Sequence, residues 1–298
     1  FGATPMSPFQ APGLNALMQE LARRASLPTV PRLYLLPQPV LQAVAAGTTE
    51  RPGIGVTRGL VDQGMALKDL SRIFITHLHS DHYLELGPLI HTAWTAGLKD
   101  RVTVWGPSGL RGYWEGFLAS MQADIDLRIE DEGRPDLRQL VSFHTIEPAT
   151  PITTGALTVT ALPAIHPPIV ESWSLSFRTE KRHVVFSGDT AHNPALVEFA
   201  RDADLLIHEA MLAEGLKALT ARVGNSDDRL MRHLRRSHTL AADAAQLARA
   251  ADVRALALHH LIPSDDPAFG PADWQRAVAP HWSGPFYLGS DGLRIPLD

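Results

Sequence analysis

Residues 76–83 read Thr76-His77-Leu78-His79-Ser80-Asp81-His82-Tyr83 and follow the apolar run Arg72-Ile73-Phe74-Ile75. Four potential metal ligands therefore fall within six positions, at the end of a strand that we predict over residues 70–76. Imidazole and carboxylate groups together suit a borderline divalent ion such as zinc. A strand end followed by a tight turn can point His77 and His79 at one ion, and Asp81 and His82 at a second ion beside it.

Further metal-competent side chains follow later apolar runs, which we predict as strands. They are His166 after residues 157–165, Asp189 after residues 183–187, His208 and Glu209 after residues 204–207, and His259 and His260 after residues 253–258. Open α/β sheets place their sites beyond the carboxyl ends of their strands. A single histidine of this kind is explained equally well by a structural hydrogen bond, but five clusters at strand ends in one chain indicate one shared site.

This set of motifs resembles that of the metallo-β-lactamase-fold hydrolases, and the resemblance covers about residues 53–298. It implies an α/β fold, a four-layer αββα sandwich, with the site at the edge where the two sheets meet. It also implies a role for each ligand: His77, His79 and His166 would bind one metal, Asp81, His82 and His260 would bind the other, and Asp189 would bridge both. The implied cofactors are two divalent metal ions, with zinc favoured over manganese or iron.

His259 and His260 compete for the last ligand position. The last ligand of the family follows a short residue after the strand, so the resemblance favours His260 and leaves His259 a structural role. His208 is interpreted in the same way, because the set of metal ligands is complete without it.

Asp189 is a carboxylate at the bridging position, which true β-lactamases lack, so it resembles the branches that act on phosphate, sulfate, lactone or thioester substrates. His208-Glu209-Ala210, with Ser237-His238-Thr239 before an Ala-rich helix, resembles the ribonuclease Z-like branch more narrowly. In that branch a Glu–His pair donates a proton to the leaving group. A carboxylate at Glu209 favours the imidazolium form of His238, whereas a helix N-terminus at His238 disfavours it. The alternative is that Glu209 and His238 form only a structural hydrogen bond.

Within this branch the stretches at residues 76–83 and 187–191 look most like those of small arylsulfatase-type hydrolases. Our leading hypothesis is an enzyme, a dinuclear metal-dependent hydrolase of small anionic esters such as aryl sulfates or phosphodiesters. Metal-bound hydroxide would attack, and Asp81, Glu209 and His238 would be the catalytic residues, the last two as the proton-donating pair. Two alternatives stay open: a lactone or carboxyl-ester hydrolase that uses the same metal site, and a catalytically disabled metal-binding interaction protein.

A cluster of arginines lies shortly before the Ala-rich helix. Arg232, Arg235 and Arg236 are candidates for binding a sulfate or phosphate anion through bidentate contacts. They fit equally a solvated helix face balanced by Asp227 and Asp228. The chain has no Gly/Lys-rich insertion of the kind that grips tRNA, and its net charge is −5 with histidines neutral. We therefore expect a small anionic ester as the substrate, and neither tRNA nor an anionic membrane as a partner.

The 298 residues suffice for one large domain or two small ones, and no run of about 18 apolar residues predicts a membrane span. The lack of cysteine excludes disulfides and thiolate ligands. The N-terminus lacks the basic and then apolar pattern of a secretion signal. We expect a soluble protein and leave its compartment open, either cytoplasmic, or periplasmic or secreted after removal of a signal.

Residues 1–52 are rich in Pro, Ala and Gly and depart from the family, whose members begin with strands. We divide the chain into this atypical segment, with one predicted helix over residues 13–25, and a hydrolase domain over residues 53–298. The first strands of the N-terminal sheet are expected to be missing, replaced or supplied by a partner chain. We therefore predict that the segment covers a sheet edge or mediates a homodimer, with a disordered tail as the alternative.

Helices and strands alternate regularly from residue 53 onward. We predict helices over residues 56–64, 83–97, 109–121, 194–200 and 239–251, a strand over residues 101–105, and a hairpin of residues 172–179 and 182–187 around Glu180-Lys181. An aromatic stripe at Tyr113, Trp114 and Phe117 is interpreted as core or pocket wall rather than as a base-stacking surface.

Overall fold

The computed structural model describes residues 4–5, 32–36, 43–48, 51–57, 67–223, 227–264, 266–290 and 293–297 of the chain. The residues fall into two units, one of residues 1–65 with 290–294 and the other of residues 66–289 with 295–298. All the side chains predicted as site residues belong to the second unit. Among the described residues, no helix is both long enough and apolar enough to cross a membrane.

The first unit contains a four-stranded sheet in the order β1-β2-β4-β3. Its strands are β1 (Thr4–Pro5), β2 (Arg32–Leu36), β3 (Ala43–Thr48) and β4 (Arg51–Thr57). Strands are therefore present in this segment, but they form a sheet of their own, and the prediction about the first strands of the N-terminal sheet stays open. Residues 56 and 57 were predicted to begin a helix but belong to β4, which runs parallel to β2 and antiparallel to β3. Pairing with strands on both sides overrides the local preference of these residues.

The remaining predictions about this part of the chain stay open. The helix predicted over residues 13–25 and the remainder of the helix predicted over residues 56–64 lie outside the described residues. The domain boundary after residue 52 stays a prediction, and so does the role of the N-terminal segment in covering a sheet edge or pairing two chains.

The second unit contains a seven-stranded sheet in the order β14-β13-β12-β11-β10-β9-β8. Its strands are β8 (Ile152–Thr154), β9 (Leu157–Pro163), β10 (Trp173–Arg178), β11 (His183–Phe186), β12 (Leu205–Met211), β13 (Leu256–Ile262) and β14 (Phe286–Leu288). Neighbours from β8 to β11 are antiparallel, and those from β11 to β14 are parallel. The predicted hairpin is confirmed as β10 and β11, which pair from Leu175 with Phe186 to Arg178 with His183.

A three-stranded parallel sheet, in the order β5-β6-β7, lies in the same unit. Its strands are β5 (Arg72–Phe74), β6 (Val102–Gly106) and β7 (Val141–Thr145). The helices of the unit are η1 (Leu67–Asp69), α3 (Ser80–Tyr83), α4 (Leu86–Thr95), α5 (Leu110–Glu132), α6 (Leu137–Leu140), α7 (Ala195–Phe199), α8 (Ala213–Val223), α9 (Arg229–Ser237), α10 (Ala241–Ala250) and α11 (Pro271–Val278).

Most predicted elements of this unit are confirmed, among them β5, β6, α4, α7 and α10. The helix predicted over residues 109–121 is longer, since α5 continues to Glu132. It ends at Gly133, whose φ of 66° suits a helix C-cap. The predicted helix ended too early because the prediction overlooked Ile125 and Ile129, which continue the apolar stripe beyond Met121 at four-residue spacing.

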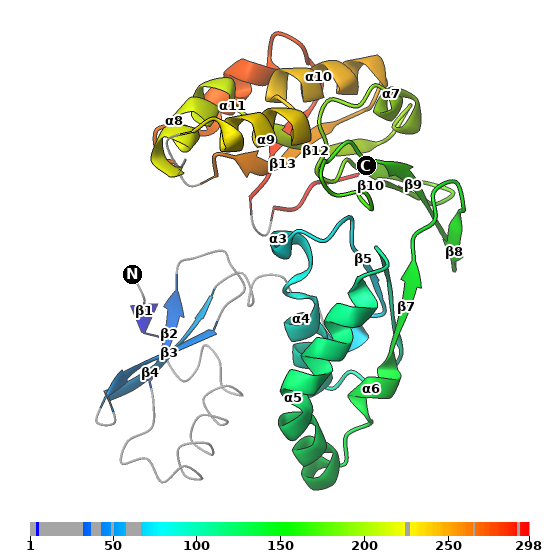
Figure 1. The fold of residues 1–298 in the computed structure, drawn as a ribbon, viewed down its shortest axis with the longest axis vertical. Helices are drawn as coiled ribbons and strands as arrows, with labels where there is room; N and C mark the ends of the chain where they lie inside the picture. The colour runs from blue at the N-terminus through cyan, green and yellow to red at the C-terminus, as the bar shows by residue number, and fades with distance from the viewer. Residues whose placement is uncertain are drawn as a thin grey trace. The chain divides into compact units, whose positions relative to one another are not determined.

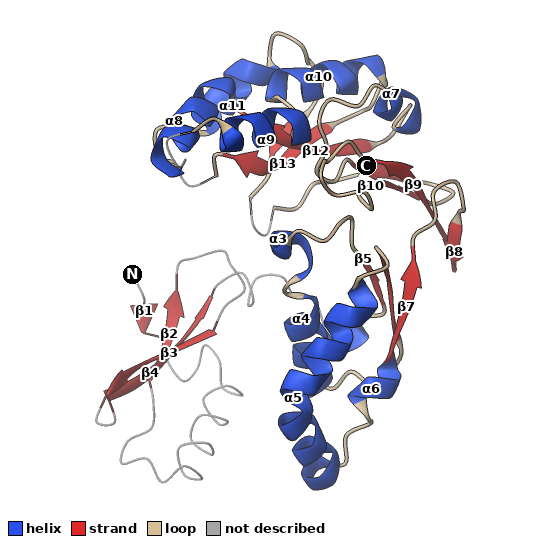
Figure 2. Cartoon of the chain, viewed as in Figure 1, coloured by secondary structure: helices blue, strands red, loops and turns tan. Residues whose placement is uncertain are grey.

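Three apolar clusters order these elements into four layers. One packs α4 and α5 against the three-stranded sheet, with Ile90, Trp114 and Val104 buried. A second packs α7, α10 and α11 against the seven-stranded sheet (Figure 1). A third, with Val159 and Leu175 buried, lies between the two sheets. The order of helices, sheet, sheet and helices that these clusters give confirms the predicted α/β four-layer sandwich. Figure 2 shows α10 over the seven-stranded sheet, and α4 and α5 beside the three-stranded sheet.

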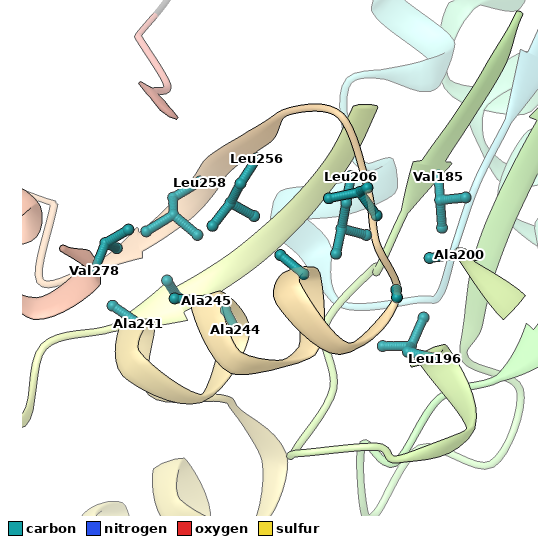
Figure 3. Packing of buried hydrophobic residues seen from close by; sticks show 14 of the residues in the cluster. Val185, Leu196, Ala200, Leu206, Ala241, Ala244, Ala245, Leu256, Leu258 and Val278 are labelled. Atoms are coloured by element: carbon teal, nitrogen blue, oxygen red, sulfur yellow. The ribbon is translucent and has the colours of Figure 1, made fainter. Parts of the chain in front are cut away.

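Helix α10 packs closely on the parallel strands that lead to the predicted site. Figure 3 shows Ala241, Ala244 and Ala245 of α10 on the side of the helix that faces Leu256 and Leu258 of β13. Small alanine side chains allow the helix backbone to approach the sheet, and the larger aliphatic side chains of the strands fill the space between them. The packing holds β12 and β13 in a fixed position, as the site requires.

Replacing Leu206 with alanine is expected to lower the free energy of unfolding by about 2–5 kcal/mol, because the truncation leaves a cavity in this cluster. The side chain is 1% exposed and lies on β12. Urea unfolding measures the change. Leu127→Ala is the matched control, since Leu127 is 62% exposed on α5 and its loss should change stability by less than about 0.5 kcal/mol. Equal effects of the two substitutions would contradict the assignment of this core.

Candidate metal centre

Three histidines from two strand ends meet with their ring nitrogens facing one another. His77 Nε2 lies 3.1 Å from His79 Nδ1, and His166 Nε2 lies 3.0 Å from the same atom. His77 and His166 are buried. A tetrahedral zinc ion with bonds of about 2.05 Å spaces its ligand atoms by about 3.3 Å. Since His79 Nδ1 can donate a hydrogen to only one of its two neighbours, the arrangement is better explained as a ligand shell than as a set of hydrogen bonds.

The ring of His166 is oriented by a contact on its other side. Its Nδ1–H donates to the backbone carbonyl of Ser237 at 2.8 Å, which leaves Nε2 as the free acceptor nitrogen. A carbonyl in this position fixes the tautomer that a metal ligand needs. His166 therefore presents a lone pair to the same point as His77 and His79.

A second group of candidate ligands lies on α3 and β13. Asp81 Oδ2 lies 3.3 Å from His260 Nε2 and 3.4 Å from His82 Nε2. Asp189 joins the two groups through one oxygen, because its Oδ2 atom lies 3.3 Å from both His82 Nε2 and His260 Nε2. The same atom lies 3.7 Å from His77 Nε2 and 3.9 Å from His166 Nε2. The side chain thus has the position that a bridging carboxylate requires.

Unpartnered buried atoms support the fit to metal ions. Within the described residues, His82 Nε2 and Asp189 Oδ1 are buried and lack any hydrogen-bond partner. A buried polar atom without a partner costs free energy, and a cation at the centre of the cluster would supply the missing interaction. Imidazole and carboxylate donors without a thiolate suit zinc, manganese or iron. The ligand roles, the identity of the metal and the number of ions stay predictions.

A β-bulge separates the roles of His259 and His260. His259 pairs with Glu209 and Leu261 pairs with Ala210, so His260 is the extra residue on β13. Its φ of 45° lies in the left-handed region, as a bulge residue allows. The bulge brings His260 to the carboxylates, whereas His259 lines a mainly apolar cavity beside Phe186. The sequence placed these histidines after the strand, and also His208 and Glu209 after theirs, but β12 and β13 continue through them.

The backbone before Asp189 depends on a glycine. Gly188 has a φ of 58°, and a Cβ atom there would lie 2.5 Å from the backbone carbonyl oxygen of Trp173. Only glycine accepts both conditions without strain. This residue sets the direction in which the chain leaves β11, and therefore where the Asp189 carboxylate lies.

Burial and neighbouring charges set the protonation of the cluster. Burial is the main cause that lowers the pKa of His77 to about 3 and that of His166 to about 4, so both are neutral near pH 7, as ligands must be. Burial by itself would raise the pKa of Asp189, but the close approach of His82 at 3.3 Å and the charges of His260, His82 and His77 outweigh it and hold the pKa below its ordinary range.

Glu209 and His238 form a buried pair beside the metal ligands. His238 Nδ1 lies 3.0 Å from Glu209 Oε1, which also accepts from the backbone N–H of Thr190 at 3.0 Å and of Thr239 at 3.3 Å. Burial raises the pKa of Glu209 well above its ordinary value and lowers that of His238. Both shifts reflect the cost of charging a group away from water, and the 3.0 Å contact couples the titration of the two residues.

The position of His238 differs from the prediction in one respect. It was expected at a helix N-terminus, but it is the C-cap of α9, and the Ala-rich helix α10 begins at Ala241 with Leu240 as its N-cap. Its ring stacks on that of His260 with 5.6 Å between centroids. A nitrogen of His238 also lies within 4.8 Å of ligand atoms of Asp189 and His260. His238 thus touches the second ligand group directly.

The predicted arginines lie on α9 and differ from one another. Arg232 is held by Asp228 at 2.6 Å, as expected of a solvated helix face, whereas Arg235 and Arg236 are exposed. Their role in binding substrate stays a prediction. Sequence analysis missed His233, which lies four residues before Ser237 on the same helix, with its ring centroid 6.0 Å from that of His238. Its position four residues before Ser237, on the same face of a helix, could have indicated from the sequence that His233 lies near the site.

Comparison with known proteins gives the family and the fold. Residues 52–234 match the family model described as anti-Pycsar protein Apyc1. A ribonuclease Z of Mycobacterium sp. strain KMS is 30% identical over 251 residues, which cover 82% of this chain and 84% of the relative. Two solved structures share the fold, each with a TM-score of 0.55. The metallo-β-lactamase fold protein YhfI of Bacillus subtilis is 19% identical and covers 88% of this chain and 86% of its own, and the short form of human tRNase Z is 18% identical with 90% and 89% covered.

The fold and the cluster of candidate ligands define a metal-dependent hydrolase of the metallo-β-lactamase fold. Within that class the chain belongs to the ribonuclease Z-like proteins, and it matches the Apyc1 family over most of its length.

Metal-free protein is expected to lose stability as the pH falls from about 6.5 toward 4. Burial is the main cause that lowers the pKa of His166 and His208 to about 4. Over this range the unfolded chain therefore binds protons that the folded chain does not, and each such histidine costs about 1.4 kcal/mol per pH unit. The raised pKa of His82 adds the opposite slope only above this range, because its contribution is fully present below about pH 6.5 and is lost as the pH rises through the folded value. Urea unfolding at several pH values measures the slope.

His208→Asn is the matched variant for this measurement. His208 is fully buried, and its Nδ1–H donates to the backbone carbonyl of Glu209 at 2.7 Å, a contact that the asparagine amide can replace. Removing its imidazole should reduce the slope by about one proton. An unchanged slope in the variant, or a flat one in the original chain, would refute the assignment.

Asp189→Ala is expected to remove at least one of two bound metal equivalents, because both ligand groups share its Oδ2 atom. Metal content after dialysis, measured by plasma mass spectrometry, checks this. Asp126→Ala is the control, since that exposed carboxylate of α5 pairs with Arg138 and lies outside the cluster. Equal metal content in the two variants would rule out a bridging role for Asp189.

Proposed function

We propose that the chain is a dinuclear metal-dependent phosphodiesterase that acts on small anionic esters. The observation that carries this proposal is the single Asp189 oxygen that both ligand groups share, with a buried Glu–His pair beside it. A site with two adjacent cations can stabilise both the attacking and the leaving oxygen of a displacement at phosphorus. A buried proton donor next to that site suits a leaving group that departs as an oxyanion.

Seven side chains would hold the two ions. His77, His79 and His166 form one group, Asp81, His82 and His260 form the other, and Asp189 belongs to both. When bound, the ions supply Lewis-acid activation of the ester and lower the pKa of water to near neutrality. Asp81 lies at the exposed side of its group and is the carboxylate best placed to orient an incoming water, because its side chain is 62% exposed.

The pair of Glu209 and His238 would protonate the leaving oxygen. Together the two residues hold one exchangeable proton, whichever of them carries it. After transfer from His238 Nε2, the imidazole is neutral with its hydrogen on Nδ1, and that hydrogen is donated to Glu209 Oε1, where the negative charge remains. The backbone N–H groups of Thr190 and Thr239 stabilise that charge. These two donors therefore offset part of the cost of the charge that proton transfer to the ester leaves on the buried carboxylate.

The names of the relatives favour phosphorus, rather than sulfur or a carbonyl carbon, as the centre of attack. The metal ligands suit all three, but the curated relatives carry the name ribonuclease, which denotes cleavage of a phosphodiester bond. Arg235 and Arg236 on α9 would bind the anionic group of a small substrate. The net charge of −5 and the lack of a Gly/Lys-rich insertion argue against tRNA itself, although one structural neighbour is a tRNase.

Glu209→Gln tests the pair through the dependence of rate on the leaving group. The variant cannot hold the shared proton, so we expect kcat/KM to fall about 100-fold or more on an aryl phosphodiester with a poor leaving group such as phenol. On bis(4-nitrophenyl) phosphate, whose leaving group needs no acid, kcat/KM should fall only slightly. His238→Ala should behave alike, and the double variant should be no worse than either single one. A loss of equal size on both substrates would exclude the proposed proton donor.

The matched panel for the reaction class is an aryl phosphodiester, an aryl sulfate, a carboxyl ester and a lactone, assayed with the metal-loaded chain. Preference for the phosphodiester supports the proposal. If the chain prefers the sulfate or either carbonyl substrate, the proposed centre of attack changes to sulfur or to the carbonyl carbon, and the proposal for the metal site is retained. Metal binding without turnover of any of them would favour a disabled interaction protein.

A further inference from the structure

His233 lies beside the metal centre and has no part in the reaction proposed above. Its ring centroid is 6.0 Å from that of His238, 6.4 Å from that of His166 and 6.5 Å from that of His79. It is therefore nearly equidistant from two candidate ligands of one metal and from the proposed proton donor. A group bound between those three rings would lie within reach of the His233 imidazole.

Within the described part of the chain, this ring has only a weak hydrogen bond. The nearest recorded partner of His233 is Ser237 Oγ, 3.5 Å from Nδ1, which is too long for a strong hydrogen bond. Ser237 Oγ instead donates its hydrogen to the Pro167 carbonyl at 2.8 Å. A structural histidine would normally have a closer partner, as His166 has in the Ser237 carbonyl. The half-buried ring of His233 is thus available to a ligand.

Arg236 adds a positive charge on the same side of α9. Residues three and four apart lie on one face of a helix, so His233, Arg236 and Ser237 share a face. The ring of His233 lies near the rings of His79 and His166, and Ser237 Oγ donates to the Pro167 carbonyl, so this face is turned toward the candidate metal ligands. Among the described residues, no carboxylate is recorded as an ion-pair partner of the exposed Arg236, whereas Asp228 holds Arg232 at 2.6 Å. The guanidinium acts on His233 electrostatically, since its charge, after burial and His238, helps to lower the pKa of that ring.

We propose that His233 and Arg236 form a binding site for the unreacting, negatively charged oxygens of the substrate's phosphate group. The proposal rests on the proposed function. A phosphodiester has one such charge that is shared between two oxygens, which an imidazole N–H and a guanidinium can both contact. The site distinguishes anionic esters from neutral ones, because a lactone or carboxyl ester has no group to place there. His233 and Arg236 bind the substrate and do not exchange protons with it.

The experiment measures both phosphate binding and turnover in the metal-loaded full chain. Inorganic phosphate is titrated calorimetrically into the original chain and into the variants His233→Ala, His233→Gln and Arg236→Ala. KM and kcat are measured on bis(4-nitrophenyl) phosphate, and metal content is measured in every sample. His281→Ala and Arg249→Ala are the matched controls, since these residues lie after α11 and at the end of α10, outside the cluster.

We expect His233→Ala and Arg236→Ala each to weaken phosphate binding and to raise KM about tenfold, with kcat within about twofold and metal content unchanged. His233→Gln retains a donor and should recover most of the affinity. Hydrolysis of a neutral carboxyl ester, if the chain has any, should not change. Both controls should match the original chain in every measurement.

Three results would overturn the inference: unchanged phosphate affinity in both alanine variants, a loss of metal in His233→Ala, or a fall in kcat with KM constant. The proposed function fails in a different way. If the original chain binds phosphate but does not hydrolyse the phosphodiester, the function is wrong, and the inference still stands when His233→Ala and Arg236→Ala bind phosphate more weakly. If the original chain turns over the phosphodiester and the variants do so with equal KM, the function stands and the inference is wrong.

Discussion

A buried carboxylate is the constraint on which the rest of this structure depends. Asp189 is 1% exposed, and its Oδ2 atom lies within 3.9 Å of four histidine nitrogens. A charge this far from water is tolerated only when surrounding groups compensate it. The four histidines come from separate parts of the chain: the loop after β5, α3, the loop after β9, and β13. These histidines can converge only where the edges of the two sheets meet. The site therefore forms only when the four layers pack together.

Two local backbone features and one helix adapt this common fold to the site. Gly188 lets the chain turn sharply after β11, and the bulge at His260 moves one side chain toward the carboxylates while its neighbour His259 faces an apolar cavity. Helix α9 then acts on both parts of the centre. The backbone carbonyl of its last residue, Ser237, accepts a hydrogen bond from the candidate ligand His166, and its C-cap, His238, pairs with Glu209. A shift of this helix would disturb a candidate ligand and the proposed proton donor together.

Local sequence predicted much of the second unit because its elements obey simple periodicity. Apolar runs gave β5, β6 and the hairpin of β10 and β11, and the motif at residues 76–83 indicated the metal chemistry together with its place at a strand end. Prediction from local sequence failed where pairing between distant segments of the chain decides the secondary structure. Residues 56 and 57 form a strand because β2 and β3 flank them in the sheet. β12 and β13 extend through Glu209 and His260 because each is the other's partner in the ladder.

Sequence by itself determined the fold class, the donor types of the candidate centre and the resemblance to a hydrolase family, because these depend on residue identity and spacing. Only the tertiary structure decided which groups touch. It brought His238 to 3.0 Å from Glu209 across 29 residues, separated His260 from His259, and placed His233 and Arg236 on the helix face that meets the ligands. The reason is physical: the direction of a side chain depends on bulges, helix rotation and sheet register, which are set by contacts between segments far apart in the chain.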